Sequence, residues 1–458
     1  MEQETRIPRI LLAAARSGSG KTLITCGILA ALKNRGLQVA SFKCGPDYID
    51  PMFHSRVIGT RSRNLDTFFA GKETVRRLLA KNAADCQISV IEGVMGYYDG
   101  LAGTSWQASA YDLAAKTETP AVFILDCQGS SLSLIPFLKG FLEYRKDSGI
   151  RGVILNRISP MLYPRMKKLM EEQLPLRVLG YVPRLSDCVL ESRHLGLVMP
   201  HEIPQLRRKL DTLAKELEKT LDLDALLKLA EEAPPLVTEE KTEKLYHTSR
   251  PVSIGVARDE AFCFFYQDNL DLLEEMGARL VYFSPIRDEK LPEGICGMIL
   301  NGGYPELYAR QLSENTAMRE SVRRAIAGGM PYTAECGGFL YLHREMEDME
   351  GRSWPMAGVI PGRAWRTEGL KRFGYVTLDG GRCFGRNVGP IPAHEFHYFD
   401  SDCCGEDFEA QKPLSARSWR CIHSNDRGMA GFPHLYYYGN LKLPEAFLKA
   451  CEEWEVRS

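Results

Sequence analysis

Two short segments of the sequence carry residues whose types and spacing could do chemistry. The first is RSGSGKT, residues 16–22, where an apolar run at 9–15 leads into two glycines, a lysine and a threonine. Glycines here let backbone N–H groups turn towards an anion, and the start of a following helix adds partial positive charge. In such a loop Lys21 reaches the β and γ phosphates of a nucleotide and Thr22 binds Mg²⁺. The predicted ATP-binding loop residues are Ser17, Gly18, Ser19, Gly20, Lys21 and Thr22.

The entrance of this loop departs from the usual phosphate-loop pattern. That pattern opens with a glycine, and Ala15 stands there in this chain. The change removes none of the groups that would contact phosphate. The alternative is a glycine-rich turn with a chance Lys-Thr pair, but the strand–loop–helix order favours the nucleotide site. The sequence predicts no specific contact for Arg16.

Acidic residues follow two further apolar runs. Asp47 and Asp50 lie in KCGPDYIDP (43–51), and Glu92 and Asp99 lie in SVIEGVMGYYDG (89–100). In a doubly wound sheet the carboxyl ends of the strands line the ligand crevice, and an acid at such a strand end is a typical Mg²⁺ partner. The alternative for the aspartates is a solvated turn. The expected metal ligands are Thr22, Asp47 and Glu92.

Two more polar residues end apolar runs on the same predicted edge of the sheet. Lys43 follows the run at 37–42, and Asn156 lies in VILNR, residues 153–157. We expect both at the nucleotide, with Asn156 against the base. The alternative for Lys43 is an ordinary surface lysine.

The second chemical segment is MPYTAECGGFLYL, residues 330–342, which predicts a strand, a tight turn and a helix. Such a turn exposes a nucleophile, here Cys336, and the following helix N-terminus favours the thiolate. Backbone N–H groups nearby can form an oxyanion hole. We expect Gly337 to contribute, together with Gly302 and Gly303 of ILNGGYPEL (299–307).

The thiolate requires a base, normally a histidine distant in sequence. His434, in GFPHLYYYGN near the end of the chain, is the base that we expect. His394 and His397 are the alternatives, and His423 is a further candidate. His343 should point away, because it lies seven residues along the same expected helix.

Positioning these groups requires two α/β domains. Short apolar runs alternate with helical patterns in the first part, which predicts βαβ units and a mostly parallel sheet. An amphipathic stretch at 203–233 ends that part, and a proline- and charge-rich segment at 231–251 precedes a new strand pattern. We predict a first domain at 1–232, a linker at 233–250 and a smaller α/β domain at 251–458. The expected strands are 9–15, 37–42, 88–92, 121–126, 152–155, 252–257, 279–283, 297–300 and 330–334.

Composition excludes several function classes. The 458 residues carry a net charge of -1, which offers no bulk attraction to nucleic acid or anionic membranes. No apolar run reaches the roughly 18 residues that a membrane span needs. The short acidic N-terminus does not resemble a signal peptide, and the 13 cysteines contain no C-x-x-C pair. These features predict a cytoplasmic protein with reduced thiols.

The ordered motifs resemble those of the corrinoid-amidating synthetases with a fused class I glutamine amidotransferase domain, the cobyrinate a,c-diamide synthase family. The shared motifs include SGSGKT, FKCGPDYIDP, SRNLDTF, IEGVMGYYDG, ESRHLGL, NGGYPELYA, ECGGFLYL and AHEFHY. The resemblance implies a deviant phosphate-loop, dethiobiotin-synthetase-like ATP- and corrinoid-binding domain, followed by a class I glutamine amidotransferase domain. It also implies ATP- and Mg²⁺-dependent amidation of the a and c carboxylates of cobyrinate in cobalamin biosynthesis, through an acyl phosphate and ammonia released from glutamine. Because free ammonia is mostly ammonium at pH 7, we expect a protected route for it.

The resemblance also implies roles for single residues. Cys336 corresponds to the glutaminase nucleophile and His434 to the residue that raises its nucleophilicity. The acids that correspond to the synthetase site are Asp47, Asp50, Glu92 and Asp99. The usual class I triad places a glutamate two residues after the histidine, where this chain has Tyr436. Either a Cys–His dyad acts alone, or another acid such as Glu306 or Glu395 orients His434.

Rival functions stay open at the level of sequence. The same chemistry could act on hydrogenobyrinate or nickel sirohydrochlorin. From another class, the first half could be a dimerising ATPase switch, although Arg16 replaces the signature lysine of such switches. The expected partners are small molecules, namely a corrinoid, L-glutamine and ATP, with a possible homodimer.

Overall fold

The computed structural model describes residues 2–185, 192–193, 196–197, 206–239 and 244–454. The motif ESRHLGL and the first residues of the amphipathic stretch at 203–233 therefore lie partly outside the described residues. The chain divides into two compact units, Met1–Lys241 and Thr242–Ser458. No helix in the described part of the chain is long and apolar enough to cross a membrane.

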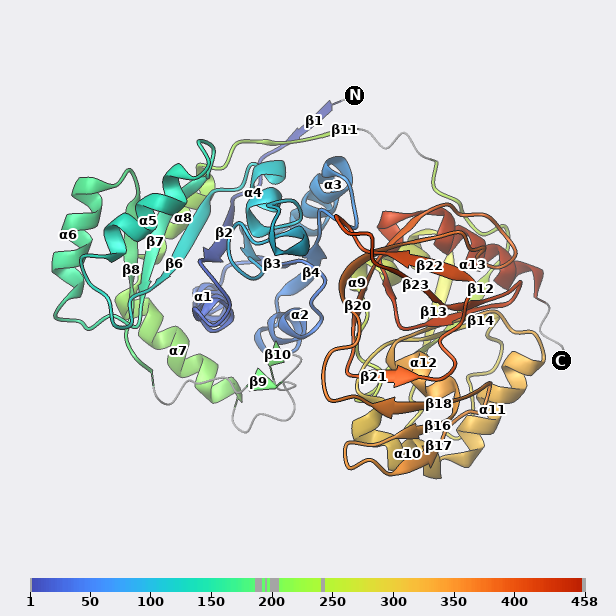
Figure 1. Cartoon of the computed structure of the whole chain (residues 1–458). Coiled ribbons are helices and arrows are strands. Elements are labelled where there is room, and N and C mark those ends of the chain that lie inside the picture. The colour runs from blue at the N-terminus through green and yellow to red at the C-terminus, as the bar shows by residue number, and fades with distance from the viewer. Residues whose placement is uncertain (1, 186–191, 194–195, 198–205, 240–243, 455–458) are drawn as a thin grey trace. The chain divides into compact units, whose positions relative to one another are not determined.

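The first unit is built on a seven-stranded sheet in the order β4-β3-β5-β2-β6-β7-β8 (Figure 1). Every pairing in it is parallel. Such sheets are covered by helices on both faces, which is why β2, β3 and β5 are buried along their whole length. The strands are β2 (Arg9–Ala14), β3 (Val39–Cys44), β4 (Arg61–Leu65), β5 (Ile88–Glu92), β6 (Ala121–Asp126), β7 (Ile150–Asn156) and β8 (Arg177–Val182).

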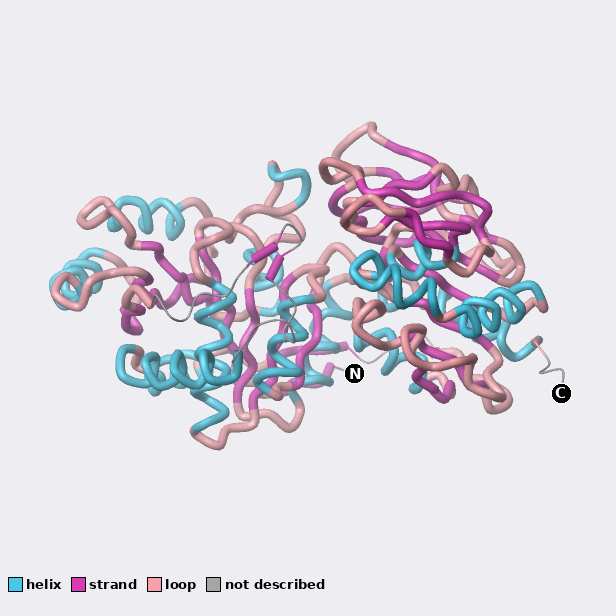
Figure 2. The backbone as a smooth tube through the Cα atoms, turned by 90° about the horizontal axis from the view of Figure 1, so that it is seen from below, coloured by secondary structure: helices cyan, strands magenta, loops and turns pink. Residues whose placement is uncertain are grey.

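Helices lie beside these strands (Figure 2). They are α1 (Lys21–Asn34), α2 (Ile49–Met52), α3 (Lys72–Ala83), α4 (Ala110–Thr117), α5 (Leu134–Glu143), α6 (Tyr163–Gln173), α7 (Leu206–Thr220) and α8 (Leu223–Glu231), with a π-helical turn η1 (Phe53–Ile58) directly after α2. The amphipathic stretch is thus two helices. Asp222 causes the break, because its carboxylate accepts the Ala225 N–H at 2.9 Å and so begins a new helix.

The beginning of the expected linker is a strand. β11 (Leu236–Glu239) pairs antiparallel with β1 (Glu2–Thr5). The guanidinium of buried Arg76 donates to the Val237 carbonyl at 3.1 Å, which attaches β11 to α3. This part of 233–250 therefore belongs to the first unit.

The second unit centres on a six-stranded sheet in the order β13-β12-β14-β15-β25-β24, parallel except for β24. Its strands are β12 (Val252–Ala257), β13 (Ala278–Phe283), β14 (Gly297–Leu300), β15 (Tyr332–Glu335), β24 (His423–Ser424) and β25 (Gly428–Gly431). Its helices are α9 (Gln267–Glu275), α10 (Ala309–Glu314), α11 (Thr316–Ala327), α12 (Gly337–Leu342) and α13 (Lys442–Glu453).

Two further sheets were not expected from the sequence. One has the order β17-β16-β18-β21 and the other the order β23-β22-β19-β20-β26. Their strands are β16 (His343–Glu347), β17 (Ser353–Pro355), β18 (Ile360–Arg366), β19 (Phe373–Asp379), β20 (Ile391–Phe396), β21 (Phe399–Ser401), β22 (Phe408–Gln411), β23 (Ser418–Cys421) and β26 (His434–Leu435).

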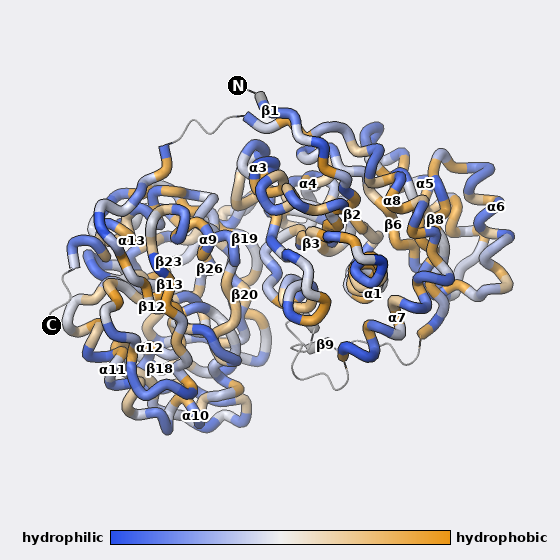
Figure 3. Tube along the Cα trace, turned by 180° about the vertical axis from the view of Figure 1, so that it is seen from behind, coloured by the Kyte–Doolittle hydropathy of each residue, from blue (hydrophilic) through white to orange (hydrophobic). Residues whose placement is uncertain are grey.

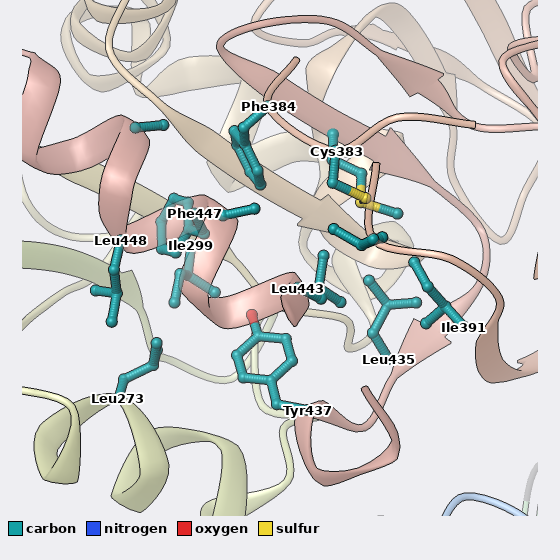
Figure 4. Close-up of a cluster of buried hydrophobic side chains, with 14 of the residues drawn as sticks. Leu273, Ile299, Cys383, Phe384, Ile391, Leu435, Tyr437, Leu443, Phe447 and Leu448 are labelled. Carbon is teal, nitrogen blue, oxygen red and sulfur yellow. The ribbon is translucent and has the colours of Figure 1, made fainter. Parts of the chain in front are cut away.

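A continuous hydrophobic cluster holds the short strand β26 in place. Leu435 packs in this cluster with Ile391 of β20, Leu443 and Phe447 of α13, and Ile299 of β14 (Figure 4). Burying each such side chain contributes about 1.5–3 kcal/mol. Hydropathy along the trace shows hydrophobic residues gathered on strands such as β2 and β6, while α3 and α7 carry many hydrophilic ones (Figure 3).

Candidate active sites

The loop between β2 and α1 has the backbone of an anion cradle. Gly18 and Gly20 have φ angles of +78° and +90°, which L side chains rarely adopt. A Cβ at Gly20 would also lie 2.5 Å from Nδ2 of Asn156. Asn156 donates from Nδ2 to the Ser19 carbonyl at 2.9 Å, so it lies against the loop as expected of a crevice residue.

Lys21 is folded back over this loop. Its Nζ donates to the carbonyls of Met95 at 2.5 Å and of Arg16 at 3.2 Å. Burial, helped by the charge of Lys43, lowers the pKa of Lys21 to about 8. These two carbonyls therefore hold the ammonium close to the cradle.

Glu92, fully buried at the end of β5, gathers the polar groups of this site. Its Oε1 accepts from Thr22 Oγ1 at 2.5 Å and from Lys43 Nζ at 2.9 Å. Its Oε2 faces His54 Nε2 at 3.1 Å. Lys43 also pairs with Asp50. The structure thus brings together Thr22, Lys43, Asp50 and Glu92, as the sequence predicted for one crevice.

The charges in this cluster depend on one another. Burial favours neutral Glu92, but the charge of Lys43 and the hydrogen bonds from His54 and Thr22 outweigh it and hold the Glu92 pKa well below its usual range. Burial likewise opposes the charge on Lys43, yet Asp50 and Glu92 raise the Lys43 pKa. Burial and the Glu92 carboxylate raise the pKa of Asp50. Glu92 is therefore an ionised carboxylate at neutral pH.

Asp47 and Asp99 are held by nearby backbone instead. Asp47 Oδ1 accepts the N–H groups of Ile49 at 2.7 Å and Asp50 at 3.2 Å. Asp99 Oδ2 accepts the Gly96 N–H at 3.0 Å. The structure shows no hydrogen bond that joins Asp47 to the Thr22–Glu92 pair among the described residues.

The oxygen donors of this site fit Mg²⁺. Among the described residues, no group of three or more His, Cys, Asp or Glu side chains is arranged to hold a metal ion. Mg²⁺ in nucleotide sites takes only one or two carboxylates, with phosphates and waters completing its shell. The Thr22 hydroxyl and the ionised Glu92, already in contact, are a donor set of that kind.

Sequence reasoning missed His54, whose imidazole is fully buried. It lies four residues after Asp50 on the continuous α2–η1 helix, so both side chains share one helix face. That i, i+4 spacing in DPMFH was the signal that could have identified it.

Arg16, at the altered entrance of the loop, has a side chain that is 76% exposed. Its guanidinium lies 3.7 Å from Asp126 at the end of β6. Arg157 binds the same carboxylate at 2.9 and 2.5 Å and donates to the Gly18 carbonyl at 3.2 Å. Two arginines therefore share Asp126 beside the phosphate loop.

Cys336 lies on a sharp turn between β15 and α12. Its φ and ψ angles are 45° and -103°, a strained conformation for a residue with a side chain. The turn is closed by the Cys336 N–H, which donates to the Gly431 carbonyl at 2.8 Å. A Cβ at Gly337 would lie 2.9 Å from the Gly303 nitrogen, so only glycine lets these two backbones approach.

His434 of β26 lies beside this turn. A Cβ at Gly302 would be 2.6 Å from His434 Cε1, so the structure brings Gly302, Gly303, Gly337, His434 and Cys336 together. Burial favours the neutral imidazole, but the Cys336 and Glu335 side chains outweigh it and raise the His434 pKa to about 9.

The other candidate histidines have different partners. His343 lies 2.9 Å from the Phe339 carbonyl and 2.7 Å from Ser401 Oγ. His397 contacts Glu395, and His423 Nε2 lies 2.8 Å from the Cys403 carbonyl. His394 lies opposite His434 in the β20–β26 pairing, and burial lowers its pKa to about 3.

The two acids suggested for the third triad position, Glu395 and Glu306, have other surroundings in the structure. Glu395 accepts from His397 at 3.0 Å and from Trp419 Nε1 at 3.1 Å. Glu306 is buried in the turn Pro305–Tyr308, where burial raises its pKa to about 7. The carboxylate that faces His434 is Glu335, whose Oε2 lies 3.6 Å from His434 Nδ1. Sequence reasoning missed this residue.

Comparison with protein families assigns each unit to a class. Residues 10–197 match the CobQ/CobB/MinD/ParA nucleotide binding domain, and residues 253–415 match the CobB/CobQ-like glutamine amidotransferase domain. A nucleotide-binding domain and a glutamine amidotransferase domain in one chain define an ATP-dependent, glutamine-hydrolysing carbon–nitrogen ligase. The predicted fold class is confirmed.

Relatives of similar length define the family within that class. "Cobyrinate a,c-diamide synthase" of Caldanaerobacter subterraneus subsp. tengcongensis is 37% identical over 451 residues, covering 97% of this chain and 98% of that protein. The protein of the same name from Clostridium acetobutylicum is 38% identical over 441 residues, covering 94% and 98%. The chain belongs to the cobyrinate a,c-diamide synthase family, as its motifs predicted.

Proposed function

We propose that this ligase amidates the a and c carboxylates of cobyrinate in cobalamin biosynthesis, with ATP as the activating substrate and glutamine as the nitrogen donor. The observation that carries the proposal is the presence, in one chain, of the Glu92 cluster at a phosphate loop and of Cys336 beside His434. Similarity over nearly the whole chain to proteins named cobyrinate a,c-diamide synthase supports the choice of substrate.

At the first site, the chain's own residues bind and position the nucleotide. Backbone N–H groups of residues 17–22 would bind its phosphates, and Lys21 would exchange the carbonyls of Met95 and Arg16 for phosphate oxygens. Asn156 would face the base while it supports the loop through Ser19. Thr22 and Glu92, with Asp47 close by, would hold Mg²⁺, which neutralises charge on the phosphoryl group when bound.

Activation of the carboxylate explains the need for ATP. A carboxylate is a poor electrophile, so we propose that its oxygen attacks the γ-phosphorus, releasing ADP and forming an acyl phosphate. Ammonia then attacks the acyl carbon and phosphate leaves. Asp50 and Asp99, acids near Lys43 and Lys21 respectively, would position these lysines and the reacting carboxylate.

At the second site, Cys336 supplies ammonia. Its sulfur attacks the glutamine amide carbon, and the oxyanion is stabilised by backbone N–H groups at Gly302, Gly303 and Gly337. His434, held protonated beside the sulfur, donates a proton to the departing nitrogen. Water then hydrolyses the thioester to glutamate and regenerates the thiolate.

Product analysis tests the substrate. The protein is incubated with ATP, Mg²⁺, glutamine and, in separate reactions, cobyrinate, hydrogenobyrinate or nickel sirohydrochlorin, and the products are weighed by mass spectrometry. Two amidations of cobyrinate are expected. Double amidation of another tetrapyrrole instead would identify that compound as the substrate. ATP turnover that needs neither glutamine nor a corrinoid would favour a dimerising ATPase switch.

We also propose a cytoplasmic location. The 12 cysteines within the described residues are all free thiols, as expected in a reducing compartment.

A further inference from the structure

The chain has no glutamate two residues after His434, where the usual class I triad carries its acid. Tyr436 occupies that position, and its hydroxyl donates to Asp268 of α9 at 3.1 Å. This contact directs Tyr436 towards α9. Any acid that orients His434 must therefore come from another element.

Glu335 comes from the strand that carries the nucleophile. It is the last residue of β15 and pairs with Gly431 of β25, three residues before His434. Its Oε2 accepts the Leu435 N–H at 3.3 Å and lies 3.6 Å from His434 Nδ1. One carboxylate oxygen thus contacts both residues of β26.

This contact has a direct consequence for the imidazole. A carboxylate facing Nδ1 favours the tautomer with a proton on that nitrogen, which leaves Nε2 available for the sulfur. The Glu335 side chain is only 16% exposed, so little water screens its charge from the imidazole of His434. The two groups therefore interact strongly.

We propose that Glu335 is the positioning residue that orients His434, so that the acid of the catalytic unit lies next to the nucleophile in sequence. This inference rests on the proposed glutaminase function of Cys336. The unit is Cys336, His434 and Glu335, with the acid supplied by β15 in place of β26.

The charged surroundings of His434 agree with this role. Glu335 approaches it from the end of β15 and Cys336 from the turn before α12, and both favour the imidazolium. His394 lies opposite it on β20, and burial keeps the pKa of His394 low, so it adds no positive charge at neutral pH. Asp268 of α9 is bound to Tyr436.

The test compares Glu335→Gln with Glu347→Gln, the same change at a paired carboxylate of the second unit whose side chain is also 16% exposed. Full-length variants are assayed for glutamine hydrolysis and for synthesis from glutamine and from ammonium chloride, with Cys336→Ala as reference. For Glu335→Gln we expect kcat for glutamine to fall at least about tenfold, because general acid–base groups contribute on the order of 10²–10⁴-fold. We expect KM for glutamine and ammonium-supported synthesis to stay unchanged, and the alkaline limb of the pH–rate profile to move to lower pH. Glu335→Asp should recover part of the rate, and Glu347→Gln, which removes only the ion pair with Arg363, should behave like the parent.

Wild-type kcat and an unshifted pH profile in Glu335→Gln would overturn the role of Glu335. So would an equal loss of ammonium-supported synthesis, which would indicate a general structural defect. If Cys336→Ala still hydrolysed glutamine, the proposed glutaminase function itself would fail, whatever the result at Glu335.

Discussion

Two buried ionisable side chains, Glu92 and His434, have their charge states set by the residues around them. Glu92 accepts from Thr22 and Lys43 and contacts His54. His434 lies between the Cys336 and Glu335 side chains. Removing one partner of such a group leaves a buried charge uncompensated, which is costly. Substitutions at these partners should therefore change the reaction rate as well as the free energy of unfolding.

His54 offers a test of the Glu92 cluster. His54→Leu removes the contact to Oε2 and should destabilise the protein by about 1–3 kcal/mol, the usual cost of a lost buried partner. It should also raise the Mg²⁺ concentration needed for ammonium-supported synthesis, because Glu92 loses its orientation. Thermal unfolding and Mg²⁺ titration of the rate measure the two effects. The matched control is His343→Leu, a fully buried histidine of the second unit, which should lose stability without a change in Mg²⁺ requirement. Identical Mg²⁺ titrations for both variants would contradict this role of His54.

The raised pKa of His434 predicts a pH dependence with a definite sign. Its pKa rises from 6.5 to about 9 on folding, because the favourable charges outweigh burial. The stability that it contributes is therefore fully present below pH 6.5 and is lost as the pH rises through about 9. In the proposed mechanism the protonated imidazole also donates a proton to the departing nitrogen, so kcat/KM for glutamine should fall with a midpoint near pH 9. A pH–rate profile from pH 6 to 10.5 measures this, and a fall centred near 6.5 would refute it.

Among the elements, most of the buried parallel strands were predictable, but β8 and β25 were not among the expected strands. The mostly apolar runs of β2, β5 and β6 lie within a residue of their expected bounds. β4, with sequence RSRNL, carries no hydrophobic period because it is an edge strand with one parallel neighbour. Most strands of the two further sheets after His343 pair antiparallel and mix polar with apolar residues, so they lack the apolar runs that mark β2 and β6.

Gly20 allows a test at the start of α1. Gly20→Ala should weaken ATP binding at least about tenfold, because the new Cβ would clash with Asn156 and force the cradle open. Gly36→Ala, just after the other end of α1, is the control, since it has a similar φ of +82° but no atom within 4 Å of the added Cβ. Both should lose about 1 kcal/mol of stability from the positive φ. Isothermal titration with ATP measures the difference, and equal affinities would show that the Gly20–Asn156 contact is unimportant.

In the whole molecule, each unit contains the candidate groups for one half of the proposed reaction. Motif order along the chain predicted two units and most of the residues that the structure brings together at each candidate site. Glu335 could not be predicted, because its contact with Leu435 joins residues 100 positions apart and depends on the register of β15 against β25. The residue at which the second unit begins could not be predicted either. The proline- and charge-rich segment was expected to be a linker, but its strand β11 pairs with β1 of the first unit.

The two half-reactions should be separable, and one variant tests this. Cys336→Ala is incubated with cobyrinate, ATP and Mg²⁺, with either glutamine or ammonium chloride as the nitrogen source, and the products are weighed by mass spectrometry. We predict no amidated product from glutamine and wild-type amounts of diamide from ammonium chloride, because the Glu92 site does not need the thiol. Diamide formed from glutamine would show that Cys336 is not needed to release ammonia, and no product from either nitrogen source in a folded variant would show that the two half-reactions are not separable.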